Sequence, residues 1–301
     1  MSTPTPGSTD VLTVSSPEQE QAATAAGSGR SATERFQEKA RAAGGEVDHE
    51  RVSAIATDAL HALHDVIRRH QVTYAEYDAL KAWMIQVGAD GEWPLFLDVW
   101  VEHVVEEVAN ADRKGAIGTI EGPYYVPGAP EATAEATLPM RDDEQGVPLL
   151  FQGTVTDLEG RPLADAKVDM WHADDAGYYS QFAPEIPEWN LRGIVRTAPD
   201  GTFKIHTMKP APYTIPHDGA CGALIRAAGW HPWRPAHLHL KVSAEGSAPI
   251  TTQLYFEGGD YVEDDVAQAV KAALVLRPVA ATSGTGEEVT YDFALDPEET
   301  A

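Results

Sequence analysis

The sequence predicts an α+β protein, in which an N-terminal helical segment is followed by an antiparallel β-sandwich. Before about residue 116, apolar residues recur at three- and four-residue steps, which is the period of an amphipathic helix. After that point, short β-rich runs alternate with proline- and glycine-containing turns, as they do in sandwiches. We therefore expect a disordered tail over 1–30, a helical domain over 31–115 and a β-sandwich domain over 116–301.

The tail and the overall composition limit the classes of function. Residues 1–29 are rich in Ser, Thr, Ala, Pro and Gly and lack the basic start and apolar run of a signal peptide. No stretch reaches the ~18 apolar residues of a membrane span, so we expect a cytoplasmic protein without membrane contact. The formal net charge of −25 argues against nucleic acid as a partner. The single cysteine, Cys221, excludes an intrachain disulfide and a multi-cysteine zinc site.

Helical segments follow the tail. Ser31–Glu34 has capping-box spacing and predicts the start of a short helix, and Thr73–Glu76 repeats that spacing. The helix that begins after Thr73 is expected to end at Gly88, and another segment is expected to begin near Pro94. The periodic apolar residues expected to form buried helix faces are Val52, Ile55, Ala59, Leu63, Val66, Tyr77, Leu80, Met84, Val87, Leu97, Val101, Val104 and Val108.

Short β-rich runs fill the second half of the chain. Turn residues such as Pro199-Asp200-Gly201 separate them, and this close spacing favours a sandwich over alternating βαβ units. A last strand is expected over Val289–Phe293. The other expected strands are Leu149–Val155, Ala166–Trp171, Gly193–Thr197, Thr202–Thr207, Leu238–Val242 and Thr251–Phe256.

The sharpest local feature is a His-x-His pair at His237 and His239, in a predicted strand. Residues two apart in a strand face the same side, ~6.5–7 Å apart, so both imidazoles can reach one metal ion. His61 and His64 have helical metal-ligand spacing. Because Ala and Leu flank them and no third ligand is near in sequence, we interpret them as ordinary helix histidines.

A metal at the His-x-His pair needs further ligands, for which carboxylates or phenolates remain. The free pKa of tyrosine is near 10, but a strongly charged ion such as Fe(III) stabilises the deprotonated ligand. Two phenolates and a hydroxide would balance the charge of Fe(III), while two neutral imidazoles add none. Spacing alone does not decide which tyrosines would serve.

Several motifs together resemble the intradiol ring-cleavage dioxygenases, and among these the actinobacterial catechol 1,2-dioxygenases. They occur in family order within residues 31–280, which the resemblance covers. The resemblance implies cleavage of catechol by O₂ between its two hydroxylated carbons, to cis,cis-muconate, in the degradation of aromatic compounds. It also implies one Fe(III) per subunit. The motifs are Thr119–Tyr125, Asp169–Ser180, Asn190–Gly193, Pro210–Pro216, Arg234–His239 and Thr251–Gln253.

The resemblance also assigns roles to residues of this chain. Tyr179 is implied to stay on the metal, while Tyr213 leaves it and takes a proton from catechol. Arg234 is implied to stabilise negative charge that develops on the substrate, and Gln253 to donate a hydrogen bond beside it. The four implied metal ligands are Tyr179, Tyr213, His237 and His239.

The wall of the substrate pocket follows from the same resemblance. His172, beside Trp171, is not a ligand in the family pattern, so we expect a hydrogen-bonded histidine on a strand face. Leu95 and Val99 also fit an ordinary helix core. The residues implied to line the pocket are Leu95, Asp98, Val99, Ile120, Gly122, Pro123, Tyr124, Val266 and Ala267.

Alternative functions and partners remain open at this point. Within the same class, the substrate could be hydroxyquinol or a chlorinated catechol. In other classes, a zinc hydrolase would need a carboxylate or third histidine ligand, and a non-catalytic binding module would take up no oxygen. The resemblance implies a homodimer through the N-terminal helices and a phospholipid in their apolar interface.

Overall fold

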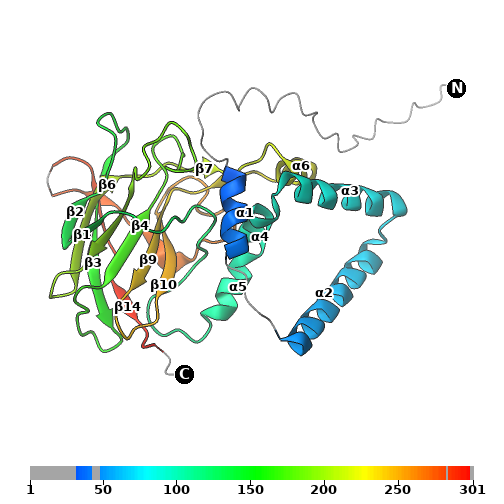
Figure 1. Ribbon diagram of the computed structural model, residues 1–301. Helices are drawn as coiled ribbons and strands as arrows, with labels where there is room; N and C mark the ends of the chain where they lie inside the picture. The colour runs from blue at the N-terminus through cyan, green and yellow to red at the C-terminus, as the bar shows by residue number, and fades with distance from the viewer. Residues whose placement is uncertain (1–31, 43–47, 283, 299–301) are drawn as a thin grey trace.

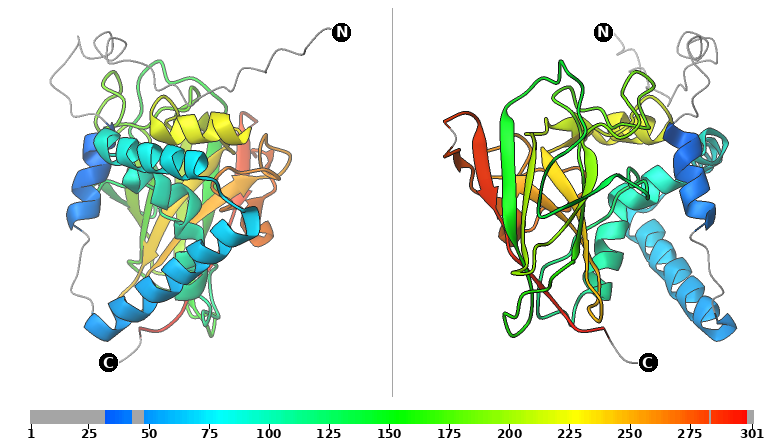
Figure 2. Two further views of the ribbon diagram at one scale, coloured as in Figure 1. Left: turned by 90° about the vertical axis from the view of Figure 1, so that its right-hand side faces the viewer. Right: turned by 60° about the vertical axis from the view of Figure 1, so that its left-hand side comes forward.

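The computed structural model describes residues 32–42, 48–282 and 284–298, which form a helical part beside a two-sheet sandwich (Figure 1). The predicted tail and the cap at Ser31 lie outside the described residues. α2 is the outermost helix, while α4 and α5 lie closer to the sheets (Figure 2). The helices of this part are α1 (Ala32–Ala42), α2 (His49–His70), α3 (Tyr74–Asp90), α4 (Trp93–Trp100) and α5 (Glu102–Ala109).

The ends of α3 confirm one prediction and correct another. At its start, the Thr73 hydroxyl accepts from the Glu76 amide at 3.3 Å, and the Glu76 carboxylate accepts from the Thr73 amide at 2.8 Å. The predicted end at Gly88 is wrong, because the helix continues to Asp90. Gly91, with a φ of 72°, takes the left-handed conformation that caps a helix, and its amide donates to the Gly88 carbonyl.

The segment predicted from Pro94 onward is two helices. Pro94 lies in the first turn of α4, as expected, but the chain breaks at Val101 and continues as α5. The predicted burial of the apolar face of α2 is also wrong, because α2 contains no buried residue. Val52 and Ile55 are about half exposed, so in this single chain the periodic apolar face is open to solvent.

Two sheets form the sandwich. The first has the strand order β1-β5-β4-β9-β10-β11, and the second has the order β12-β13-β3-β6-β2, with β14 paired to β3. The pairs β4 with β9 and β3 with β6 are antiparallel, whereas β13 pairs in parallel with β3, and the edge strands β1, β2 and β11 also pair in parallel. Twenty-four buried residues, among them Phe151, Leu238 and Leu254, form the apolar core of the sandwich.

The predicted strands match the observed ones closely, except the last. Val289–Phe293 is divided between two strands that both pair with β3. Several two- and three-residue strands and helix α6 (Ala220–Ala228) were not predicted. The strands are β1 (Glu131–Thr133), β2 (Glu135–Thr137), β3 (Pro148–Asp157), β4 (Lys167–Trp171), β5 (Arg192–Arg196), β6 (Thr202–Met208), β7 (Tyr213–Thr214), β8 (Trp233–Arg234), β9 (His237–Ser243), β10 (Ile250–Phe256), β11 (Val275–Leu276), β12 (Val279–Ala280), β13 (Glu287–Thr290) and β14 (Phe293–Leu295), with a 3₁₀ turn, η2, at Ala272–Leu274.

Candidate active site

Alternation along β9 places the two predicted histidines on the outer face of the first sheet. Leu238 and Leu240 belong to the core between the sheets, so His237 and His239 point to the opposite side. There a second apolar cluster, which includes Trp171, joins this face of the sheet to α1, α4 and the loops. The candidate site therefore lies outside the sandwich core, between the sheet and the helical part.

Imidazole and phenol groups converge at this place. Nε2 of His239 lies 3.0 Å from Nε2 of His237 and 3.0 Å from the phenol oxygen of Tyr179. The ring of Tyr213 packs edge-on against that of Tyr179, with centroids 5.3 Å apart, and lies 5.6 Å from that of His237. All four side chains are buried. The structure thus brings together the four residues that the sequence suggested as ligands.

Both histidines are buried as neutral rings, and His237 is held in the tautomer that binds metal. Nδ1 of His237 donates to the Pro235 carbonyl oxygen at 2.7 Å, which leaves the lone pair of Nε2 facing His239. The ring of His239 stacks on Trp171 at 4.8 Å. Burial lowers the pKa of His237 to about 3 and that of His239 well below its usual range. Both imidazoles are therefore neutral at physiological pH, as ligands must be.

The tyrosines need a cation to ionise. Burial raises the pKa of Tyr179 well above its ordinary value, and burial also raises that of Tyr213. Tyr124 stacks on Tyr179 with centroids 4.2 Å apart and fixes the plane of its ring. A strongly charged metal ion would provide the positive charge that these buried phenols require to become phenolates.

The spacing of the donor atoms fits one metal ion. Donors ~2.1 Å from a common ion and at right angles to each other lie ~3.0 Å apart. The separations of Nε2 of His239 from Nε2 of His237 and from the Tyr179 phenol oxygen both equal that value. Two nitrogen lone pairs facing each other at this distance repel unless a cation lies between them. Within the described part of the chain, no group of three His, Cys, Asp or Glu residues suits a metal ion.

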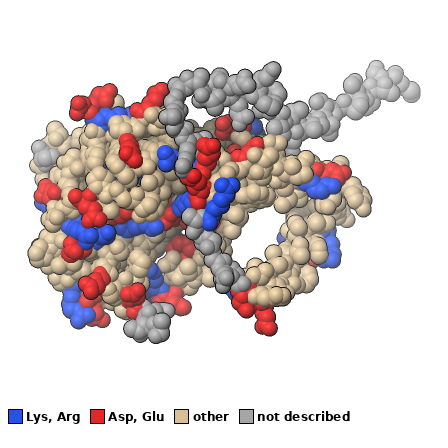
Figure 3. Space-filling model, in the orientation of Figure 1, with Lys and Arg blue, Asp and Glu red and all other residues tan. Residues whose placement is uncertain are grey.

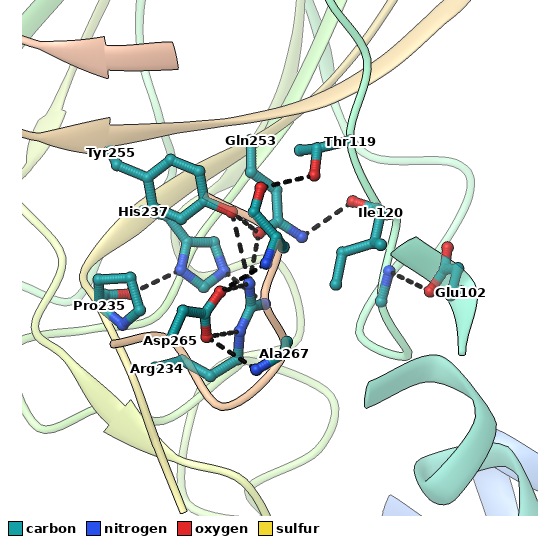
Figure 4. A network of polar contacts seen from close by, with 12 residues as sticks. Glu102, Thr119, Ile120, Arg234, Pro235, His237, Gln253, Tyr255, Asp265 and Ala267 are labelled. Atoms are coloured by element: carbon teal, nitrogen blue, oxygen red, sulfur yellow. Dashed lines mark hydrogen bonds and ion pairs between the residues drawn. The ribbon is translucent and has the colours of Figure 1, made fainter. Parts of the chain in front are cut away.

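Arg234 is anchored beside His237 by a buried network (Figure 4). Its guanidinium donates twice to the Asp265 carboxylate, each time at 3.0 Å, and once to Oε1 of Gln253 at 2.9 Å. One guanidinium nitrogen lies 3.4 Å from Nε2 of His237. Nε2 of Gln253 donates to the Ile120 carbonyl oxygen at 2.9 Å, which ties the network to the loop that begins there. The site therefore contains a fixed positive charge next to the converging donors.

A small cavity adjoins the donors and contains eight of the nine predicted wall residues. In this structure its free volume is about 10 Å³, roughly the room for one water molecule. Tyr213 and Arg234 line it, whereas Tyr179 does not. The predicted Val266 lines a different hollow with Trp100 and Trp230. The cavity is lined by Leu95, Asp98, Val99, Ile120, Gly122, Pro123, Tyr124, Tyr213, Ile215, Arg234 and Ala267.

Contacts from the helical part hold the cavity wall in place. Lys39 on α1 donates to the Gly122 carbonyl oxygen at 2.8 Å, and the Glu102 carboxylate accepts from the Glu121 amide at 2.9 Å. Gly122 has a φ of 69°, in the left-handed region that favours glycine. Phe36 on α1 packs edge-on against Tyr124 at 5.5 Å. The N-terminal helices thus help to shape the cavity.

Sequence reasoning missed three buried residues of this region. Asp265, the partner of Arg234, lies 31 positions further along the chain, and no local pattern marks it. Tyr255 donates to Gln253 at 2.9 Å from the same face of β10. Arg192 falls within a motif that was recognised but was given no role. A signal for Arg192 was available in the sequence. Arginine stays charged and is rarely buried, yet this one stands at the start of a buried strand.

His172 has the structural role that the sequence predicted. Its Nδ1 donates to the Ala173 carbonyl oxygen at 2.7 Å, and its Nε2 accepts from the Thr207 hydroxyl at 2.7 Å. Burial lowers the pKa of His172 to about 4. The neutral ring therefore satisfies both of its nitrogens within the protein.

Acid should destabilise the protein partly through His172. Between pH 6.5 and 4, the unfolded state binds a proton at His172 that the folded state excludes, so stability falls as pH falls through this window. The slope from one such group is at most about 1.4 kcal/mol per pH unit. His172→Gln should make the pH dependence shallower by up to that amount, measured by urea unfolding at pH 7, 6 and 5. Equal slopes in both proteins would contradict this assignment.

Two family models together match most of this chain. A family model described as Dioxygenase matches residues 120–297, and one described as Catechol dioxygenase N terminus matches residues 49–117. The chlorocatechol 1,2-dioxygenase of Rhodococcus opacus is 43% identical over 239 residues, covering 77% of this chain and 93% of the relative. The catechol 1,2-dioxygenase of Acinetobacter baylyi is 36% identical over 266 residues, covering 81% and 85%. The crystal structure of 3-chlorocatechol 1,2-dioxygenase from Rhodococcus opacus 1CP has a TM-score of 0.78 and 48% identity, covering 83% of this chain and all of that one.

Proposed function

Because the chain belongs to the intradiol ring-cleavage dioxygenase family, we propose that it opens the ring of catechol with O₂ between the two hydroxylated carbons, giving cis,cis-muconate. The family uses non-haem iron, and we propose one Fe(III) per chain, held by two tyrosines and two histidines. One observation carries this proposal. Nε2 of His239 lies 3.0 Å from both Nε2 of His237 and the phenol oxygen of Tyr179, next to a small cavity. The proposed ligands are Tyr179, Tyr213, His237 and His239.

The two tyrosines differ in their access to the substrate. When bound, iron(III) supplies a Lewis acid and electron acceptor for the two diol oxygens. Tyr213 lines the cavity, so its phenolate is the group that an entering diol meets and the base that accepts one of its protons. Tyr179 stacks on Tyr124 and does not line this cavity, so we assign to it the role of the ligand that keeps its place.

Arg234 and the cavity wall complete the proposed mechanism. The buried guanidinium lines the cavity, where it stabilises negative charge that develops on the substrate as it reacts with O₂. Gln253 holds this guanidinium from one side while binding the Ile120 carbonyl oxygen with its other end. Leu95 and Val99 on α4 keep water away from the reacting ring.

Metal analysis combined with oxygen uptake tests the proposal. We expect about one iron per chain and a wine-red colour from phenolate-to-iron charge transfer. Catechol should be consumed with O₂ to give a product that absorbs in the near ultraviolet. A colourless preparation that is replete with iron would reject the tyrosine ligands, and a yellow semialdehyde product would mean extradiol cleavage.

Chlorinated catechols are a second candidate substrate class. Curated relatives of this chain carry the name chlorocatechol 1,2-dioxygenase, and the cavity wall is mostly apolar. Leu95, Val99 and Ala267 can accommodate a chlorine atom, but they offer no hydrogen bond to the third hydroxyl of hydroxyquinol.

We therefore expect kcat/KM to be about tenfold to a hundredfold lower for hydroxyquinol than for catechol or 4-chlorocatechol, because a buried hydroxyl without a partner is costly. Steady-state oxygen uptake with the three substrates measures the ratio. Val99→Thr adds a hydroxyl to the wall at similar side-chain volume. It should reduce the difference in kcat/KM between hydroxyquinol and catechol. Equal values in the unmodified enzyme would contradict the prediction.

The open apolar face of the helical part is the basis for the proposed homodimer. Val52, Ile55 and Leu63 on α2 and Leu80 and Met84 on α3 are all exposed. The visible face of this helical arm carries few charged groups (Figure 3). We propose that a second copy covers it and that a phospholipid fills part of the interface. No described helix has both the length and the apolar character needed to cross a membrane. Sedimentation of a monomer at micromolar concentration would reject the dimer.

A further inference from the structure

Arg192 is a second buried arginine close to the proposed ligands, and the mechanism above does not use it. Its side chain, at the start of β5, is 1% exposed. Nε donates to the Ser180 hydroxyl at 2.7 Å, and Nη2 donates to the Ser180 carbonyl oxygen at 3.1 Å. Nη1 donates to the Tyr124 carbonyl oxygen at 2.8 Å. One guanidinium therefore joins the residue after Tyr179 to the backbone of the residue whose ring stacks on Tyr179.

The guanidinium groups of Arg192 and Arg234 differ in the charge of their hydrogen-bond partners. Arg234 faces the Asp265 carboxylate through two hydrogen bonds, whereas all three hydrogen bonds from Arg192 go to neutral oxygens. The guanidinium carbon of Arg192 lies 5.9 Å from the centre of the Tyr179 ring, within the range of cation–π contacts. A buried cation is costly unless opposite charge is near. The Asp169 carboxylate supplies part of this charge, and a Tyr179 phenolate would supply more.

We propose that Arg192 is a positioning residue for the Tyr179 ligand, fixing the Tyr179–Ser180 segment against Tyr124 and presenting a permanent positive charge to the phenolate. This inference rests on the proposed function, because it takes Tyr179 to be a metal ligand. The two phenolates then each have an arginine of their own. Arg234 lies at the cavity with Tyr213, and Arg192 lies behind the ligand that keeps its place.

Variants of Arg192 in the iron-loaded enzyme separate its charge from its hydrogen bonds. Arg192→Met removes both, so the phenolate electrons rise in energy and the charge-transfer band should move to longer wavelength. Iron should pass to a chelator roughly 10- to 100-fold faster, the usual effect of losing a partner of a metal ligand. Arg192→Lys keeps the positive charge but loses the planar guanidinium that makes several hydrogen bonds at once. Its charge-transfer band should therefore stay near that of the unmodified enzyme, while iron is lost faster.

Two further variants keep the test decisive. Arg196→Met, four residues along the same strand, removes an arginine that pairs with Glu131 and Asp165 on the surface, and it should change neither the band nor the rate of iron loss. Ser180→Ala removes only the hydroxyl that accepts from Nε of Arg192. It should still fold and lose iron faster than the unmodified enzyme, even if Arg192→Met does not fold.

The outcomes distinguish this inference from the proposed function. A red, iron-loaded Arg192→Met enzyme with an unshifted band and an unchanged rate of iron loss would overturn the role of Arg192. If that variant does not fold, an unchanged rate in Ser180→Ala would overturn it. A colourless unmodified enzyme that contains iron would instead overturn the tyrosine ligands themselves, and with them the proposed function.

Discussion

His237→Ala should lose its iron and its ring-cleaving activity, each by more than about 100-fold. Loss of a residue that merely supports a ligand costs about 10- to 100-fold in metal affinity or activity, so loss of a ligand should cost more. Nε2 of His237 lies 3.0 Å from Nε2 of His239, and its Nδ1 is already fixed by the Pro235 carbonyl. Alanine leaves no donor atom at that position. Iron content after purification and oxygen uptake with catechol measure the two losses.

His172→Gln is the matched control for this experiment. His172 is as buried as His237 and lies just beyond the neighbouring strand β4, but both of its ring nitrogens bond to the protein. The control should be less stable yet keep its iron and its red colour. Normal iron content in His237→Ala, or equal iron loss in both variants, would refute the assignment of His237 as a ligand. Tyr179→Phe extends the test to a phenol ligand.

Arg234→Met should lower both stability and turnover. Removing one partner of a buried ion pair costs about 3–5 kcal/mol, because the Asp265 carboxylate is left buried without a counter-charge. Burial alone would raise the pKa of Asp265, but Arg234 holds it below its usual value. This stabilising contribution is present above the unfolded pKa, near 3.9, and is lost as pH falls through the lower folded pKa.

The loss of turnover should be separable from the loss of stability. Removing a fixed group that stabilises charge in the transition state typically lowers kcat by about 10²- to 10³-fold. Adding Asp265→Asn to Arg234→Met removes the unpaired charge and should restore part of the free energy of unfolding. It should not restore kcat, because the cavity still lacks its cation. A double variant with normal kcat would show that Arg234 acts only through the folded structure.

The sequence predicted those residues of the site whose placement depends on the regular alternation of side chains along a strand. His237 and His239 follow from the alternation of side chains along a strand, because that alternation depends only on neighbouring residues. Tyr179 and Tyr213 followed only from the resemblance, since their positions depend on loops that no period describes. The wall residues Leu95 and Ile120 likewise came from the resemblance, and the cavity contains both.

What the sequence did not predict depends on long-range contacts. Asp265 pairs with Arg234 across 31 positions, and local sequence contains no trace of that pairing. The regular spacing of apolar residues in α2 predicted that this face is buried. Such spacing identifies an apolar face but not the surface that covers it. In the single chain the face is exposed. Gly88 was taken for a helix end because any glycine can fill that role, while the left-handed conformation was adopted at Gly91.

The separate origin of the histidine ligands and most of the cavity wall has an evolutionary consequence. The histidines come from β9 at the centre of a sheet, whereas the wall, apart from Tyr213, Ile215 and Arg234, comes from α4, from residues 120–124 and from Ala267. Substitutions in the α4 part of the wall can therefore accumulate without displacing the histidines or disturbing the packing between the sheets. Such an arrangement lets a lineage change its preferred aromatic compound by drift at a few helix and loop positions while its chemistry stays constant.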